Sequence, residues 1–184
     1  MQAPDIDKDI IARARCGHRE AFRLLVDSLA KLTFNLAWRL TYNSADAEDL
    51  TQEIFLRLHR NLDKYDPSLP FMPWFRTLAT NICLNHLKRR RVTRAASLDA
   101  HEGMEVAGPD AKTPTGDFDE KLRQAVQELP EEYRLVVTYL SFHDLGVSEI
   151  AEAMQVPVGT VKTWLFRARD ELKQKLKPFV ASQM

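Results

Sequence analysis

Apolar residues recur at intervals of three and four over most of the first sixty positions of the chain. This spacing predicts helix across residues 9–62. The apolar positions that define it early on are Ile10, Ala14, Phe22, Leu25, Val26, Leu29, Leu32 and Leu36. Within this stretch, "NSADAEDLTQEIFLRLHRNL" opens with residues that cap helices, Ser44 or Asp46, and continues with Leu50, Ile54 and Leu58 at intervals of four.

Prolines then interrupt the helical pattern. The stretch "YDPSLPFMPWF" is predicted to be a loop or a bend because proline cannot sit inside a regular helix. Helical spacing resumes in "WFRTLATNICLNHLKRRR", with Phe75, Leu78, Ile82 and Leu87 expected on the buried side.

The second half of the chain divides into an aperiodic stretch and a helical one. Residues 93–117 combine small polar residues and glycines without a sustained period, which predicts a flexible linker. Helical patterns return from residue 118, with breaks at Pro130, around "HDLGV" and at "VPVG". The expected fold is all-α, with small helical domains at 1–92 and 118–184 joined by that linker.

The composition of the chain argues against several classes of protein. An apolar fraction of 45% in 184 residues is ordinary for folded protein. No run of eighteen apolar residues occurs and the N-terminus is polar, so we expect no membrane insertion, no secretory signal and a cytoplasmic location. Cys16 and Cys83 belong to no CxxC pair and are expected to be buried thiols; we predict no metal and no cofactor.

The net charge of zero conceals an uneven distribution. Residues 71–98 contain six basic side chains and no acidic one, whereas residues 99–132 contain ten acidic and three basic ones. Electrostatic attraction to a polyanion acts over roughly 8–10 Å at physiological salt, so local blocks matter more than the total. The pattern indicates two nucleic-acid contacts separated by an acidic linker.

A helix-turn-helix is the strongest local signal, in "SEIAEAMQVPVGTVKTWLFRA". Ser148 is a suitable cap for its first helix and Pro157 suits the start of the second, while Gln155 occupies a turn position where glycine is often preferred. The inward stripe of the second helix is Val161, Leu165, Ala168 and Leu172, which leaves Lys162, Thr163, Phe166 and Arg167 outside.

Those outward residues suit a DNA major groove. Lysine and arginine bind guanine acceptors or phosphates, threonine bonds either way, and phenylalanine meets a thymine methyl. The alternative is an ordinary helical hairpin whose basic face is solvated.

The first domain carries two further surfaces. Asp49, Gln52 and Glu53 lie on one outer side of their predicted helix, which suits a polar or basic protein partner, or water. Beyond the prolines, the aromatic residues Phe71, Trp74 and Phe75 precede a helix bearing amide and cationic side chains, a combination suited to unstacked bases. The alternative is that these aromatic residues are core and the cations are solvated.

The order of "DAEDLTQEIFLRL", "YDPSLPFMPWFRTLATN", an acidic stretch and "LPEEYRLVVTYLSFHDLGVSEIAEAMQVPVGTVKTWLFRARDEL" resembles that of bacterial extracytoplasmic-function (ECF, group IV) RNA polymerase sigma factors. The resemblance covers residues 8 to 176. It implies a transcription initiation factor, not an enzyme, that joins core RNA polymerase and promoter DNA and is held inactive by an anti-sigma factor. It also implies that the linker threads toward the active-site and RNA-exit region of the polymerase.

The resemblance assigns roles to particular positions. Contacts with core polymerase, on the β′ clamp helices and the β subunit, fall on Asp49, Leu50, Gln52, Glu53, Ile54 and Phe55. Recognition and opening of the −10 element fall on Phe71, Trp74, Leu78, Asn81, Asn85, Lys88, Arg89 and Arg90, with a flipped base held by Asn81 and the preceding loop. Recognition of the −35 element falls on Arg134, Thr160, Lys162, Thr163, Phe166, Arg167 and Arg169, with Arg134 and Arg169 as phosphate contacts.

One departure from the family pattern affects the −10 assignment. Family members often have an aromatic residue followed by arginine where "WFRTLA" places Arg76 and Thr77.

The residues leave two other functions open: a stand-alone helix-turn-helix regulator with a ligand-binding or dimerisation domain in front, and a purely protein-binding adaptor. A nuclease or recombinase is disfavoured because no carboxylate cluster lies in a basic setting.

Overall fold

The computed structural model describes residues 4, 6–96, 117–142 and 145–181, and every regular element in these ranges is helical. The first four α-helices are α1 (Lys8–Arg15), α2 (Arg19–Thr41), α3 (Ser44–Asn61) and α4 (Phe71–Ala96), with a short 3-10 helix η1 (Leu62–Lys64) after α3. The remainder are α5 (Asp117–Gln127), α6 (Glu131–Phe142), α7 (Val147–Met154) and α8 (Val158–Ala181). The all-α prediction is confirmed.

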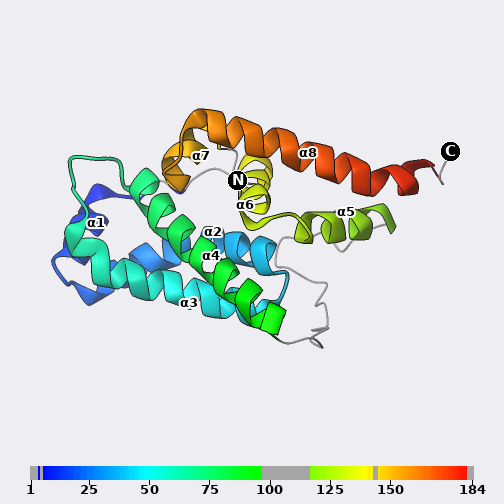
Figure 1. Cartoon of the computed structure of the whole chain (residues 1–184). Coiled ribbons are helices and arrows are strands. Elements are labelled where there is room, and N and C mark those ends of the chain that lie inside the picture. Colours follow the sequence, from blue (N-terminus) through cyan, green and yellow to red (C-terminus); the bar gives the residue numbers. More distant parts are fainter. Residues whose placement is uncertain (1–3, 5, 97–116, 143–144, 182–184) are drawn as a thin grey trace.

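The helices α2, α3 and α4 form the frame of the first domain, with α1 packed against α2 (Figure 1). Apolar residues at helical spacing meet in its centre, and Leu25, Leu29, Leu50, Ile54 and Leu58 are completely buried. Each such side chain stabilises the fold by about 1.5–3 kcal/mol through removal of apolar surface from water. The periodicity of the sequence therefore identified this core.

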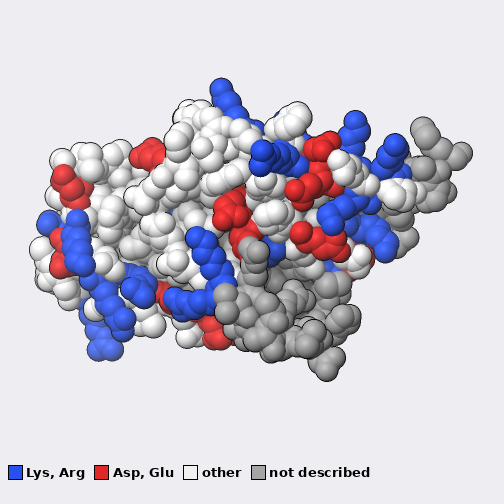
Figure 2. Space-filling model, in the orientation of Figure 1, with Lys and Arg blue, Asp and Glu red and all other residues white. Residues whose placement is uncertain are grey.

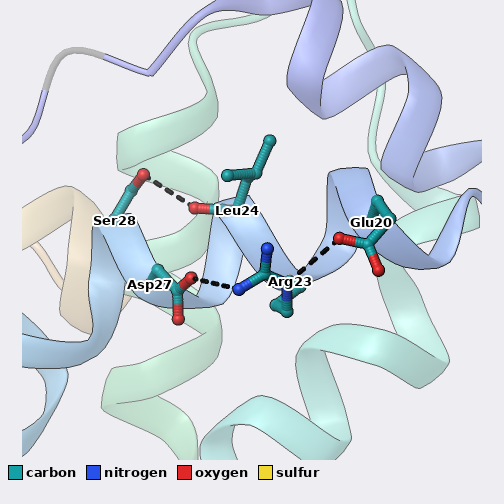
Figure 3. A network of polar contacts seen from close by, with 5 residues as sticks. All are labelled: Glu20, Arg23, Leu24, Asp27 and Ser28. Carbon is teal, nitrogen blue, oxygen red and sulfur yellow. Dashed lines mark hydrogen bonds and ion pairs between the residues drawn. The ribbon is translucent and has the colours of Figure 1, made fainter.

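The outer face of α2 is polar and locally paired. Arg23 lies between Glu20, at 3.1 Å, and Asp27, at 3.7 Å, and Ser28 donates to the Leu24 carbonyl one turn earlier (Figure 3). All these side chains are exposed, so the ion pairs contribute only a few tenths of a kcal/mol each. They keep the long helix soluble on the side that faces away from α3 and α4.

The second domain consists of α5 to α8. In Figure 1 the long helix α8 extends over α5 and α6, and α7 joins it at one end next to α4. Leu135, Val136, Ile150 and Val161 are completely buried at its centre. This buried set continues without interruption into that of the first domain.

The two domains are joined by specific contacts as well as by apolar packing. The hydroxyl groups of Thr80 in α4 and Tyr139 in α6 lie 2.6 Å apart and both residues are buried. Arg76 of α4 lies 3.5 Å from Glu149 of α7. The described part of the molecule is therefore a closed arrangement, in which α6 and α7 cover one side of α4.

Several boundaries differ from the sequence-based predictions. Helix α4 begins at Phe71 inside the predicted loop, because Pro73 lies in the first turn, where its missing N–H has no intrahelical partner to lose. The same helix continues to Ala96, so residues 93–96 of the predicted linker are helical; residues 97–116 lie outside the described residues. The stretch predicted to be helical across 9–62 is divided at Gly17, where φ is +85°, and at Tyr42, where φ is 51°.

Both predicted helix caps are wrong, and one of the two cysteines predicted to be buried is exposed. Asn43, not Ser44 or Asp46, caps α3 by accepting from the backbone N–H of Asp46 at 3.0 Å. Gly146, not Ser148, precedes α7, and its N–H donates to Glu149 at 2.9 Å.

Cys83 is buried, which raises its pKa to about 12, but Cys16 is exposed just after α1.

The position of the α3 cap gives a stability test. We expect Asn43→Ala to lower the free energy of unfolding by about 0.5–2 kcal/mol, because it leaves an N–H group of the first turn without its side-chain acceptor. Ser44→Ala is the matched control and should change stability less, since Ser44 lies inside the helix. Urea unfolding followed by circular dichroism measures both; equal losses would contradict the assigned cap.

Candidate nucleic-acid interface

The second helix of the helix-turn-helix presents its predicted outward residues to solvent. Lys162, Thr163, Phe166 and Arg167 are all exposed, and Phe166 retains 73% of its surface, the largest exposed fraction among the large apolar residues of the described chain. Single exposed apolar side chains are ordinary on protein surfaces, so the significance of Phe166 lies in the cations beside it. The arrangement therefore presents one apolar and two cationic groups together on the N-terminal half of α8.

Local contacts fix the orientation of this surface. The Thr163 hydroxyl donates to the Gly159 carbonyl at 2.9 Å, which leaves its oxygen able to accept. The Arg167 guanidinium lies 3.5 Å from the Tyr133 hydroxyl of α6, which raises the pKa of Arg167 further above its ordinary value. Of the predicted inward stripe, Val161, Leu165 and Ala168 are buried and Leu172 is half-buried, so α8 can rotate little about its axis.

The turn before α8 has the backbone that the sequence indicated. Gln155 ends α7 in the left-handed conformation, with φ 54° and ψ 44°. Val156 donates to the Ala151 carbonyl at 3.0 Å, and Pro157 precedes the first residue of α8. A non-glycine residue in this conformation costs about 1 kcal/mol, which the surrounding turn must offset.

A groove of about 420 Å³ lies between α3 and α4 and gathers much of the predicted −10 set. Trp74, Leu78, Asn81, Asn85 and Arg89 line its α4 wall. Their spacing of three and four residues places them along one side of the helix. The sequence-based grouping of an aromatic ring with amide and cationic side chains is therefore realised as one concave surface.

The opposite wall was not anticipated. Glu53, Arg57, Asn61 and Lys64 line it from α3 and η1. Glu53 was predicted to bind polymerase, and Arg57, Asn61 and Lys64 follow it at intervals of three or four residues without having been assigned a role. Glu53 lies 3.7 Å from Arg89 across the groove, so the remaining lining cations Arg57 and Lys64 give it a positive balance. Figure 2 shows basic side chains gathered over the α3 and α4 side of the molecule.

The structure separates the aromatic residues of this region. Phe71 and Phe75 are buried, stacked with ring centroids 6.0 Å apart, and Phe71 meets Tyr65 edge-on at 5.3 Å. Phe71 therefore fits the core interpretation and is not presented to DNA in the groove. Trp74 is half-buried with its surface toward the groove. Lys88 is exposed, and the side chain of Arg90 lies outside the described residues.

The loop before α4 borders a second hollow. This hollow, about 480 Å³, lies between that loop and α1, and its lining includes Arg15, Tyr65, Ser68 and Leu69. Tyr65 donates to the Leu69 carbonyl across the loop. The backbone N–H of Ser68 donates to Asp66 at 2.9 Å, and these hydrogen bonds from Ser68 lower the pKa of the carboxyl. Asn81 lines the α3–α4 groove instead, so the two parts of the predicted base-holding site lie in different hollows.

The predicted polymerase contacts on α3 divide by burial. Asp49 and Gln52 are exposed, and Glu53 and Phe55 are half-buried. Leu50 and Ile54 are completely buried, so they support the outer surface from inside and cannot meet a partner themselves. The exposed Leu56, which retains 58% of its surface, lies one turn after Gln52.

Arg134 has a different position from the one predicted for a phosphate contact. Its guanidinium donates to the carbonyls of Leu40, at 3.0 Å, and Leu129, at 3.1 Å, and to that of Gln127. It is half-buried and bridges the ends of α2 and α5. A phosphate contact by Arg134 would require this bridge to open. Thr160 is half-buried. Arg169 is exposed, and a side chain that contacts DNA must be exposed.

The described residues also show what they hold of metal-binding clusters and membrane-spanning helices. No group of three or more histidine, cysteine, aspartate or glutamate side chains is placed to hold a metal ion within the described residues. None of the helices in those ranges is long and apolar enough to cross a membrane.

Comparison with known proteins identifies both halves of the chain. Residues 25–93 match the family model for sigma-70 region 2, and residues 119–172 match that for sigma-70 region 4. The first match contains the α3–α4 groove and the second contains the helix-turn-helix.

Relatives align along almost their whole length. The RNA polymerase sigma-H factor of Pseudomonas aeruginosa is 28% identical and covers 98% of both chains. The ECF RNA polymerase sigma factor SigW of Bacillus subtilis is 28% identical over 92% of this chain and 96% of its own. The ECF sigma-E factor of Escherichia coli is also 28% identical, over 95% and 96%.

Two solved structures share the fold. CnrH, in complex with the cytosolic domain of CnrY, superposes with a TM-score of 0.68 at 21% identity, over 95% of this chain and 99% of that one. The sigma factor RpoE from Bartonella quintana, in complex with the anti-sigma factor NepR, gives 0.67 at 20% identity, over 86% and 98%. From the two matched regions and the full-length relatives together, the chain belongs to the ECF family of alternative RNA polymerase sigma factors.

Proposed function

We propose that this chain joins core RNA polymerase through α3, reads a −35 element with α8 and captures the single strand of a −10 element in the α3–α4 groove. The observation that carries the proposal is the pairing of two unlike surfaces in one chain. One is a helix-turn-helix with exposed base-reading side chains, and the other is a groove suited to unstacked bases.

The groove suits single-stranded rather than double-stranded DNA. Base stacking on an aromatic ring contributes about 1–3 kcal/mol per base, and Trp74 offers such a ring beside the carboxamides of Asn81 and Asn85. A hollow of about 420 Å³ has room for an extruded base. Arg57, Lys64 and Arg89 provide positive charge for the backbone.

The charge of the whole chain indicates why polymerase is needed. Non-specific affinity for duplex DNA arises mainly from release of counterions by cationic side chains, and here basic and acidic residues balance at 26 each. The free chain should therefore bind duplex promoter DNA weakly. Polymerase supplies additional contacts that offset the cost of strand separation, and the chain itself needs no catalytic group.

The anti-sigma partner is part of the same proposal. Two structural neighbours were solved with partner chains, one with the cytosolic domain of CnrY and one with the anti-sigma factor NepR, and at their identity of 20–21% the likeness is one of fold. We infer that an equivalent protein covers the α3 and α8 surfaces of this chain. Because polymerase and DNA act in the cytoplasm, we place the chain there.

In vitro transcription tests the function directly. We expect core RNA polymerase to initiate from a subset of a randomised promoter library only when this chain is added. Sequencing of the transcripts then defines both elements. Gel shifts without polymerase are the companion measurement: tight, specific duplex binding by the free chain, with no transcription, would instead identify a stand-alone helix-turn-helix regulator.

The α3 surface is tested by removing its exposed polar groups. We expect Asp49→Ala and Gln52→Ala each to weaken association with core polymerase by about 1–3 kcal/mol, within the range measured for buried polar interface contacts. Neither side chain is buried, so the thermal unfolding midpoint should stay unchanged. Asp9→Ala, which removes an exposed carboxylate on α1, is the control; identical polymerase affinity for all three variants would refute the α3 contact.

The −35 contact is tested on α8. We expect Lys162→Ala and Arg167→Ala each to cost about 1–3 kcal/mol in binding of the −35 element by the holoenzyme and to relax specificity at one position. Lys173→Ala removes an exposed charge farther along the same helix and should act weakly and equally on all sequences. If Lys173→Ala and the other two changes have equal effects, α8 does not read bases.

A further inference from the structure

Gln155 combines a strained backbone with a side chain at the edge of the α3–α4 groove. It comes from the turn of the helix-turn-helix, yet it lines the groove together with Trp74, Asn81 and Asn85. Within the described residues, Tyr42 is the other non-glycine residue with positive φ, and its ring is buried. Glycine would adopt this backbone conformation with less strain. Because Gln155 is exposed, packing in the core does not explain why a residue with a side chain occupies the position.

We propose that the turn of the helix-turn-helix, through Gln155, is an intramolecular ligand of the α3–α4 groove and competes with single-stranded DNA for it. The identity of the competing ligand rests on the proposed function. A carboxamide carries one donor and one acceptor group, as the edge of a base does. The groove wall presents the matching carboxamides of Asn81 and Asn85.

Two contacts hold the turn in this place. The Arg76 side chain, only 12% exposed, pairs with Glu149 one and a half turns before Gln155, and Glu149 also fixes the start of α7 through the Gly146 N–H. On the preceding helix, α6, the hydroxyl of Tyr139 lies 2.6 Å from that of Thr80, and both residues are buried. The turn is thus fastened to α4, the helix that forms one wall of the groove.

Promoter geometry makes this arrangement incompatible with engagement of both elements. Elements centred about 25 base pairs apart lie about 85 Å apart at 3.4 Å per base pair. Gln155 and Phe166 are eleven residues apart, mostly along one helix, which corresponds to about 17 Å. The reading face of α8 is therefore far too close to the groove, and the turn must leave the groove before the −10 strand enters it.

The experiment compares three variants of the full-length chain. Gln155→Gly removes both the side chain and the backbone strain. Gln155→Asn keeps a carboxamide but shortens the side chain by one methylene, and asparagine tolerates the left-handed conformation. Glu152→Gln changes an exposed residue of α7 and is the control. Fluorescence anisotropy measures binding of a labelled oligo(dT) of about twelve nucleotides, within the range that single-strand sites cover. Amide hydrogen exchange in α7 measures release of the turn without any DNA.

We expect Gln155→Gly and Gln155→Asn to bind the oligonucleotide three- to tenfold more tightly than the parent and to exchange faster in α7, with Glu152→Gln unchanged. Unaltered affinity and exchange in both Gln155 variants would overturn the proposal. Failure of every protein to bind oligo(dT), while transcription with core polymerase succeeds, would also overturn it but leave the proposed function intact. Loss of transcription as well would refute the function itself.

Discussion

Helix α4 is the element on which the rest of the structure depends, because it packs on two sides at once. One side meets α3 and α2 through Phe75, Ile82 and Leu87, and another meets α6 and α7 through Thr80 and Arg76. A helix buried on two sides has only a narrow strip left for solvent. That strip carries Asn81, Asn85 and Arg89, so the same helix that closes the core also displays the groove.

The balance of charge complements this arrangement. A strongly cationic groove would hold nucleic acid regardless of sequence, because counterion release does not discriminate between bases. Here Glu53 faces Arg89 at 3.7 Å and reduces the positive field in the groove. Affinity then depends more on stacking and on carboxamide hydrogen bonds, which act only on exposed bases. A neutral chain is therefore suited to a partner that brings separated strands to it.

Helical periodicity predicted the cores and the outward face of α8 because both follow from spacing along a single helix. Burial of Leu50 and exposure of Phe166 required no knowledge of other elements. The caps were misplaced because Asn43, Ser44 and Asp46 are all competent, and the choice depends on where the preceding turn at Tyr42 ends α2. Local signals leave such choices open by a residue or two.

The missed features all depend on contacts between distant segments. Phe71 was assigned to DNA through the family resemblance and because it precedes a helix with amide and cationic side chains, yet Tyr65 and Phe75 enclose it. Arg57 and Lys64 acquire a role only because α4 lies opposite them. No spacing within one helix could indicate that Gln155 approaches a groove formed by residues sixty-six or more positions earlier.

The polar contacts between the domains differ in how readily water can replace them. Arg134 donates to carbonyls at the ends of α2 and α5, where helix termini lack intrahelical partners and carry partial negative charge. Of these carbonyls only that of Leu40 belongs to the first domain, and water can bind it once the domains part, so this bridge resists opening only weakly. Thr80 and Tyr139 are buried among apolar neighbours, and burial raises the pKa of Tyr139. Separation of α4 from α6 at this pair exposes apolar surface to water, which costs free energy. A protein partner that covers this surface removes the cost, and a change of salt or pH does not.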